Sequence, residues 1–157
     1  MEKQIDFYFD LVSPYSYIAS MLIDDVARRG NAKVSWKPFL LGGVFKAVGT
    51  TEAPGLHPAK KPYLLKDLQR LSGHLKIPIK MPPDFPVRTV LAMRTLCGFN
   101  ADEIPQAAHT LYKAYWVNNQ DIADPEVVAS LVGSDAVERA GIQEIKDKLF
   151  HSTVEAV

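Results

Sequence analysis

The sequence has a single cysteine among its 157 residues, and this scarcity excludes an internal disulfide. One thiol also excludes dithiol redox chemistry within the chain, because thiol–disulfide exchange needs two sulfur atoms. A chain so poor in cysteine fits a reducing compartment, and we expect a cytoplasmic protein. Cys97 falls on the apolar stripe of an expected helix, where we expect an inert core residue.

An excess of one charge and long apolar runs are also missing. Lys and Arg together number 18, and so do Asp and Glu, which gives no electrostatic reason to expect nucleic acid or an anionic membrane as a partner. No apolar run approaches the roughly 20 residues that span a bilayer. The opening residues MEKQ lead directly into an expected strand, without the apolar core of a signal peptide. His57 lies on the loop of the candidate site and the other three histidines are scattered, at spacings that suggest no metal site.

The first 48 residues follow the pattern of a βαβ unit. Residues 5–9 and 34–39 are short apolar runs typical of buried strands, and residues 14–29 carry a helical apolar stripe between them. Gly30 is expected to end this helix, and Gly42 and Gly43 to close the second strand. The crossover between the two parallel strands is expected to be right-handed.

From residue 49 onward the sequence predicts helices alone, over residues 64–75, 87–97, 104–116, 125–131 and 142–157. We therefore expect two regions, an N-terminal βαβ unit over residues 1–48 and a helical region over 49–157. A two-stranded parallel sheet is not found on its own, because both its faces and both its edges need cover. We therefore expect that strands completing the sheet are missing from this chain.

The candidate site is the strand-to-helix junction in residues 7–17, FYFDLVSPYSY. Ser13 occupies an expected helix N-cap and Pro14 the first helical position, where helix starts attract anions. Ser13 and Ser16 have the spacing of a redox Cys-x-x-Cys, and a hydroxyl there could donate a hydrogen bond to another molecule's thiolate. The alternative is a cap that stabilises the helix by about 1 kcal/mol and does no chemistry. A hydrolase-type serine nucleophile is disfavoured because Val12 and Pro14 flank it in place of glycine.

This junction closely resembles the opening of the 2-hydroxychromene-2-carboxylate isomerases and the kappa-class glutathione transferases. Residues 54–63, 77–79, 82–86 and 115–125 resemble further segments of the same family. The resemblance implies an α/β, thioredoxin-like fold with a large all-helical insertion, akin to that of DsbA. In that family a cis-proline segment, two strands and a closing helix follow the helix that matches residues 142–157. The family comparison and the two-strand sheet therefore lead to the same expectation, that the C-terminal half of the thioredoxin domain is missing from this chain.

The resemblance also implies which residues contact glutathione. Ser13 matches the catalytic serine that contacts the glutathione sulfur, with Pro14 and Tyr15 beside it in the cofactor site. Lys60 matches a lysine that contacts the tripeptide, although a solvated charge is the alternative. Thr50 lies near a family asparagine, in a loop whose length differs by one residue.

Three further residues are candidates for substrate contact: Tyr17, Trp116 and Asn118. Packing in the core explains the two aromatic residues equally well or better. By resemblance, the protein is expected to be a glutathione-dependent isomerase of a small aromatic substrate in aromatic degradation, and a homodimer. Two alternatives remain, a kappa-class-like glutathione S-transferase that releases a conjugate and a non-catalytic thioredoxin-like binding module.

Overall fold

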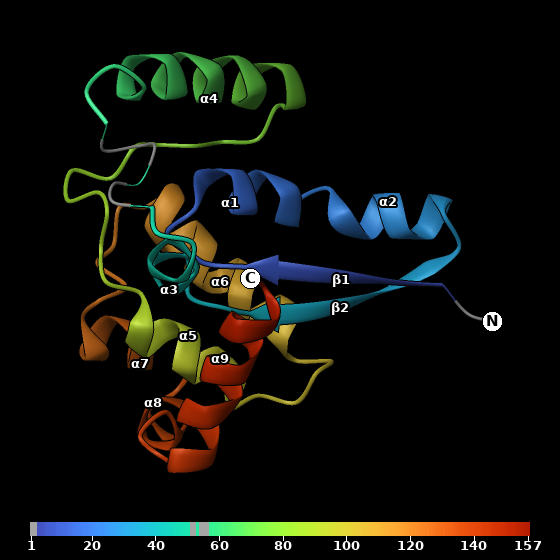
Figure 1. Cartoon of the computed structure of the whole chain (residues 1–157), viewed down its shortest axis with the longest axis vertical. Coiled ribbons are helices and arrows are strands. Elements are labelled where there is room, and N and C mark those ends of the chain that lie inside the picture. Colours follow the sequence, from blue (N-terminus) through green and yellow to red (C-terminus); the bar gives the residue numbers. More distant parts are fainter. Residues whose placement is uncertain (1–2, 51–52, 54–56) are drawn as a thin grey trace.

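The structure, a computed structural model, describes residues 3–50, 53 and 57–157. The chain begins with a βαβ unit whose strands, β1 (Lys3–Phe9) and β2 (Ala32–Pro38), pair in parallel with Phe7 opposite Trp36. Two short helices join them, α1 (Pro14–Ser20) and α2 (Ile23–Arg29). Figure 1 shows both helices running above the strands. The predicted strand–helix–strand order is confirmed, with strand boundaries shifted by one or two residues.

The rest of the described chain is helical, as predicted from residue 49 onward. Its helices are α3 (Leu41–Ala47), α4 (Lys61–Leu75), α5 (Val90–Cys97), α6 (Ile104–Trp116), α7 (Pro125–Val132), α8 (Ser134–Arg139) and α9 (Gln143–Glu155). Figure 1 shows α4 set apart at the top of the molecule and α9 below the sheet. Within the described residues, none of the helices is both long and apolar enough to span a bilayer.

The prediction of one uninterrupted helix over residues 14–29 is wrong, because the helix is interrupted between α1 and α2. The hydroxyl of Ser20 donates to the carbonyl of Tyr17 at 2.7 Å, and such a bond competes with the helical ladder. The backbone N–H of Leu22 then donates to Ala19 three residues earlier, which tightens the last turn and redirects the chain.

Two helices were not predicted, and each of them contains glycine or directly follows one. Gly42 and Gly43 were expected to end the second strand, yet they lie inside α3. A Cβ on Gly43 would come within 2.9 Å of the Thr153 side chain, so this glycine permits close approach of α3 to α9. The second missed helix, α8, follows Gly133, whose φ of +96° separates it from α7.

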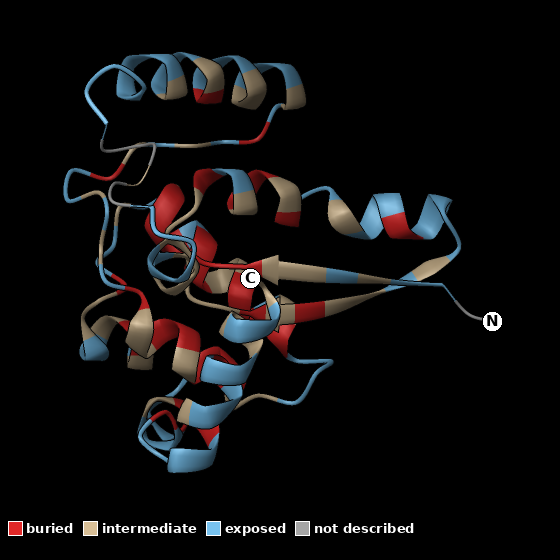
Figure 2. Cartoon of the chain, in the orientation of Figure 1, coloured by how far each residue is buried: buried red, intermediate tan, exposed pale blue. Residues whose placement is uncertain are grey.

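The core lies where the aromatic face of β1 meets α6. Phe9 is fully buried, and its ring packs edge-on against Trp36 and tilted against Tyr112. Figure 2 shows that buried residues gather on α5 and α6 and at the carboxyl end of β1, whereas α2 and α4 are mostly exposed or half-buried. The core therefore supports the junction at which the candidate site begins.

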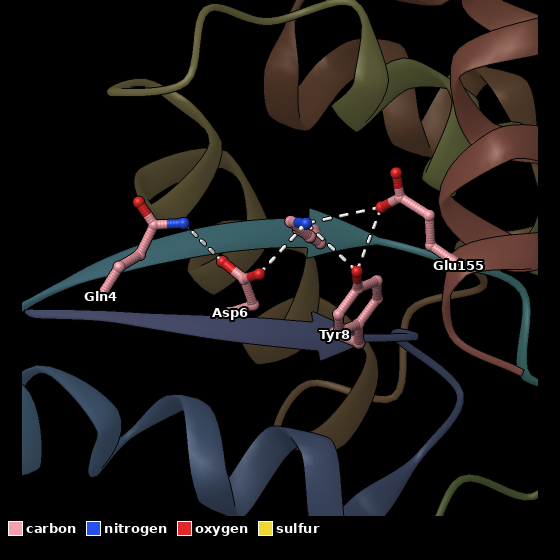
Figure 3. Close-up of polar contacts among 5 residues, drawn as sticks. Gln4, Asp6, Tyr8 and Glu155 are labelled. Carbon is pink, nitrogen blue, oxygen red and sulfur yellow. Dashed lines mark hydrogen bonds and ion pairs between the residues drawn. The ribbon is translucent and has the colours of Figure 1, made fainter.

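A polar cluster on the opposite face of the sheet holds the end of α9 in place (Figure 3). The ammonium of Lys37 lies 3.2 Å from a carboxylate oxygen of Asp6 and 3.4 Å from one of Glu155. It also donates to the hydroxyl of Tyr8, which in turn donates to Glu155. The hydrogen bond to Tyr8 and the contact with Asp6 raise the pKa of Lys37, so these partners favour its charged form. It couples β1, β2 and α9 through one cation.

Cys97, predicted to be inert core, is a buried residue of α5. Burial raises the pKa of its thiol to about 11. We expect a thiol-reactive chromogenic reagent to leave the folded protein unlabelled at pH 8 and to label one thiol per chain after denaturation, because only the exposed thiolate reacts. Rapid labelling of the folded protein would contradict this placement. Since the thiol stays protonated when folded but ionises near pH 9 when unfolded, its contribution to stability falls as pH rises above that value.

Candidate active site

A cavity of about 500 Å³ opens at the carboxyl end of β1, where the predicted junction lies. Three segments far apart in the sequence form it: the turn entering α1, the start of α3, and residues 85–90 before α5. Leu64 of α4 adds a further wall. Most lining side chains are apolar, among them Val12, Leu41 and Phe45, so the cavity suits a ligand with an apolar or aromatic body.

Ser13 lies on the wall of this cavity, and its predicted capping role is confirmed. Its Oγ accepts the backbone N–H of Ser16 at 3.2 Å, and Pro14 takes the first helical position. Within the described residues the Ser13 hydroxyl has no hydrogen-bond acceptor, so its proton is free for a bound ligand. Because α1 has only seven residues, the hydroxyl is the stronger basis for stabilising an anion here than the helix dipole.

Tyr15 also lines the cavity, but its phenol already has a partner. The hydroxyl donates to a carboxylate oxygen of Asp67 at 2.6 Å, which links the start of α1 to α4. Burial, together with this hydrogen bond and the charge of Asp67, raises the pKa of Tyr15 to about 12. The phenol therefore stays protonated and engaged at neutral pH, and the ring is the part of Tyr15 available to a ligand.

Asp10 is a lining residue that the sequence analysis missed. It is 2% exposed, and burial raises the pKa of its carboxyl group. The hydroxyl of Thr89, also buried and also lining the cavity, donates to it at 2.8 Å. A signal was present in the sequence, because Asp10 is the one charged residue in the otherwise apolar stretch 7–12.

The remaining predicted cofactor residues, Lys60 and Thr50, lie outside the described lining of the cavity. Lys60 is exposed and precedes α4, while Thr50 is exposed and donates its backbone N–H to Phe45. Residues 54–56, part of the segment that resembles the family loop, lie outside the described residues.

Arg88, on the cavity wall, was not predicted. In the described chain neither Lys60 nor Arg88 forms an ion pair.

The three residues predicted to contact substrate do not line the cavity in the described structure. Trp116 is fully buried, and its Nε1 donates to the carbonyl of Leu11 at 2.9 Å. Tyr17 is 3% exposed, and its hydroxyl donates to the carbonyl of Pro78. Asn118 is exposed after α6. The alternative of core packing therefore fits both aromatic residues.

Comparison with known proteins agrees with this geometry. Residues 4–153, nearly the whole chain, match the family described as the DSBA-like thioredoxin domain. This chain belongs to that family. A solved structure of 2-hydroxychromene-2-carboxylate isomerase superimposes with a TM-score of 0.82 at 21% identity, covering 98% of this chain and 78% of that one. The α/β thioredoxin-like, DsbA-type fold predicted from the sequence is confirmed, with two parallel strands among the described residues.

Relatives by sequence include enzymes of two kinds. Human glutathione S-transferase kappa 1 is 28% identical over 170 residues, which cover 98% of this chain and 75% of the human protein. The 2-hydroxychromene-2-carboxylate isomerase of Sphingobium xenophagum is 31% identical over 86 residues, which cover 54% of this chain and 44% of that protein. The predicted resemblance to both groups is therefore confirmed.

Proposed function

We propose that this protein is a glutathione-dependent isomerase of the 2-hydroxychromene-2-carboxylate type. The observation that carries the proposal is the Ser13 hydroxyl, which caps α1 through its oxygen on the wall of a largely apolar cavity and, among the described residues, has no acceptor for its proton. A donor at this position suits a thiolate held beside an aromatic substrate. The names of the relatives, one of them a 2-hydroxychromene-2-carboxylate isomerase, support the same reading.

Glutathione fits the chemistry of the residues present. Its thiol end needs a hydrogen-bond donor, which Ser13 offers, and its carboxylates need cations. Arg88 on the cavity wall and the exposed Lys60 are both without an ion pair among the described residues, so either charge is available to a carboxylate. We propose Ser13, Pro14 and Tyr15 as the residues around the sulfur, and Lys60 with Thr50 as outer contacts of the tripeptide.

Bound glutathione would supply the nucleophile, a thiolate that adds to the conjugated substrate, permits rotation about the former double bond and then leaves. The chain supplies the surroundings of this chemistry. The Ser13 hydroxyl donates to the sulfur and favours its ionised form over the thiol. Apolar walls, including Val12 and Phe45, exclude water and hold the ring system of the substrate. No atoms are gained or lost overall, which is what an isomerisation to trans-o-hydroxybenzylidenepyruvate requires.

A kappa-type glutathione S-transferase is the second candidate, and the extent of sequence similarity favours it. The human kappa relative matches 98% of this chain, against 54% for the isomerase of Sphingobium xenophagum. A transferase would use the same Ser13 donor but release a thioether, because in its substrate the thiolate either displaces a leaving group or adds to a double bond and is not eliminated again.

The first experiment is a calorimetric titration of the protein with glutathione, followed by product analysis. We expect saturable binding of glutathione and weaker binding of its S-methyl derivative, since the derivative cannot form the thiolate that Ser13 stabilises. Incubation with 2-hydroxychromene-2-carboxylate is then expected to give the isomer with glutathione recovered unchanged. A stable thioether would favour the transferase. No detectable binding of glutathione would contradict both enzymes and leave the non-catalytic module.

A further inference from the structure

Asp10 is a carboxylate in a place where a charged group is costly. It directly follows β1, is 2% exposed and lines the cavity beside Ser13. Within the described residues it forms no ion pair, so no cation offsets the cost of burying it. A carboxylate kept under these conditions must be held by hydrogen bonds, and its partners show what it does.

Three donors converge on this one carboxylate, each from a different segment of the cavity wall. The backbone N–H of Val12 donates to Oδ1 at 3.1 Å, from the turn that leads into Ser13. The backbone N–H of Leu41 donates to Oδ2 at 2.9 Å, from the first residue of α3. The hydroxyl of Thr89 donates to Oδ1 at 2.8 Å, just before α5. All three donor residues line the cavity themselves.

The backbone of Asp10 adds a direct link to Ser13. Its carbonyl accepts the N–H of Ser13 at 3.0 Å, while its side chain accepts the N–H of Val12. These two hydrogen bonds stabilise the turn formed by Leu11 and Val12, and so they fix the position of Ser13 after the end of β1. The N-cap residue of α3, Leu40, has a side chain that makes no capping hydrogen bond. The Asp10 carboxylate accepts the N–H of Leu41 and so takes the place of an N-terminal cap for α3.

We propose that Asp10 is a positioning residue of the Ser13 site, which holds the Ser13 turn, the start of α3 and Thr89 in one fixed arrangement around the cavity. It does not touch the reacting atoms but sets the distance between the Ser13 hydroxyl and the opposite walls. The ligand assigned to the site rests on the proposed function, whereas the arrangement of the three segments does not.

The test is Asp10→Asn, because an amide has one acceptor oxygen in place of two. It cannot accept from Val12 and Leu41 together, so one backbone donor loses its partner. We expect amide hydrogen exchange at Val12 or Leu41 to speed up by about tenfold, since an unpartnered buried donor is strongly disfavoured. The dissociation constant for glutathione is expected to rise by about tenfold as well, with Asp102→Asn, at an exposed carboxyl, as the matched control.

Thr89 supplies a second test that does not depend on Asp10→Asn folding. Thr89→Ser keeps the hydroxyl donor to Asp10, whereas Thr89→Val removes it at nearly the same volume. We expect Thr89→Val to weaken glutathione binding by about threefold and Thr89→Ser to retain wild-type binding, since one of three bonds is lost. Equal behaviour of the two variants would overturn the proposal.

The outcomes separate this proposal from the proposed function. If the wild-type protein does not bind glutathione, the proposed function fails, and exchange at Val12 and Leu41 still decides the role of Asp10. If glutathione binds, and Asp10→Asn lowers the melting temperature while leaving local exchange and the dissociation constant as in wild type, Asp10 has only a general structural role. That result would overturn the proposal and leave the glutathione site intact.

Discussion

Ser13→Ala is expected to lower turnover with glutathione by about 100-fold or more, as removal of a donor to a developing or resident anion does in other enzymes. The reason is the position of the hydroxyl, which lies on the cavity wall with its proton unengaged in the described structure. The variant also loses its cap bond to Ser16, at a cost of about 1 kcal/mol in the free energy of unfolding. The measurement is steady-state kinetics with glutathione saturating, beside denaturant unfolding of the same sample.

Two further variants separate the hydroxyl from the cap. Glycine is tolerated at an N-cap at a cost of a few tenths of a kcal/mol relative to serine, so Ser13→Gly keeps the helix nearly as stable but has no hydroxyl. Ser13→Thr keeps both the hydroxyl and the cap. We expect Ser13→Gly to be as inactive as Ser13→Ala, and Ser13→Thr to retain part of the activity. Turnover of Ser13→Ala within about twofold of wild type would remove Ser13 from the mechanism.

Trp116→Ala is expected to lower the free energy of unfolding by about 3–5 kcal/mol, the usual cost of truncating a buried tryptophan. Trp116 has no exposed surface, its ring packs against Tyr115 edge-on at 4.9 Å, and its indole N–H is the partner of the Leu11 carbonyl. Such a loss is a large part of the stability of a domain, which is about 5–15 kcal/mol in all. Urea unfolding followed by circular dichroism measures it.

A matched control is Tyr63→Ala on α4, because Tyr63 is 68% exposed. We expect that variant to change the free energy of unfolding by no more than about 0.5 kcal/mol. Trp116→Phe adds a finer comparison, since it keeps an aromatic ring but leaves the Leu11 carbonyl without its donor. If the Trp116 variants weakened substrate binding and left stability unchanged, the residue would be a substrate wall after all, and its placement in the core would be wrong.

The features predicted correctly from the sequence are those set by residues close together in the chain. The cap at Ser13 with Pro14 forms as the sequence predicts. The apolar stripe of α6 also gave that helix its boundaries. These features depend on neighbours in the chain, which a sequence pattern records.

The features that were missed depend on contacts between distant residues. The start of α3 is stabilised by Asp10, 31 positions earlier, and Leu40 donates to Thr153, 113 positions later. Gly43, interpreted as a strand end, is small because α9 packs against it. No local pattern in residues 40–47 could have revealed either partner. The same holds for the cavity, since residues 85–90 reach Ser13 only in the folded chain.

The most direct test of the central claim is the pKa of the glutathione thiol when it is bound. Ultraviolet absorbance of the thiolate, followed against pH with the protein in excess, measures it beside free glutathione in the same buffer. If the Ser13 hydroxyl donates to the sulfur, the bound thiol will have a pKa at least about one unit below the free one, and Ser13→Gly will return it to the free value. A bound thiol that titrates at the same pH as free glutathione would contradict the account.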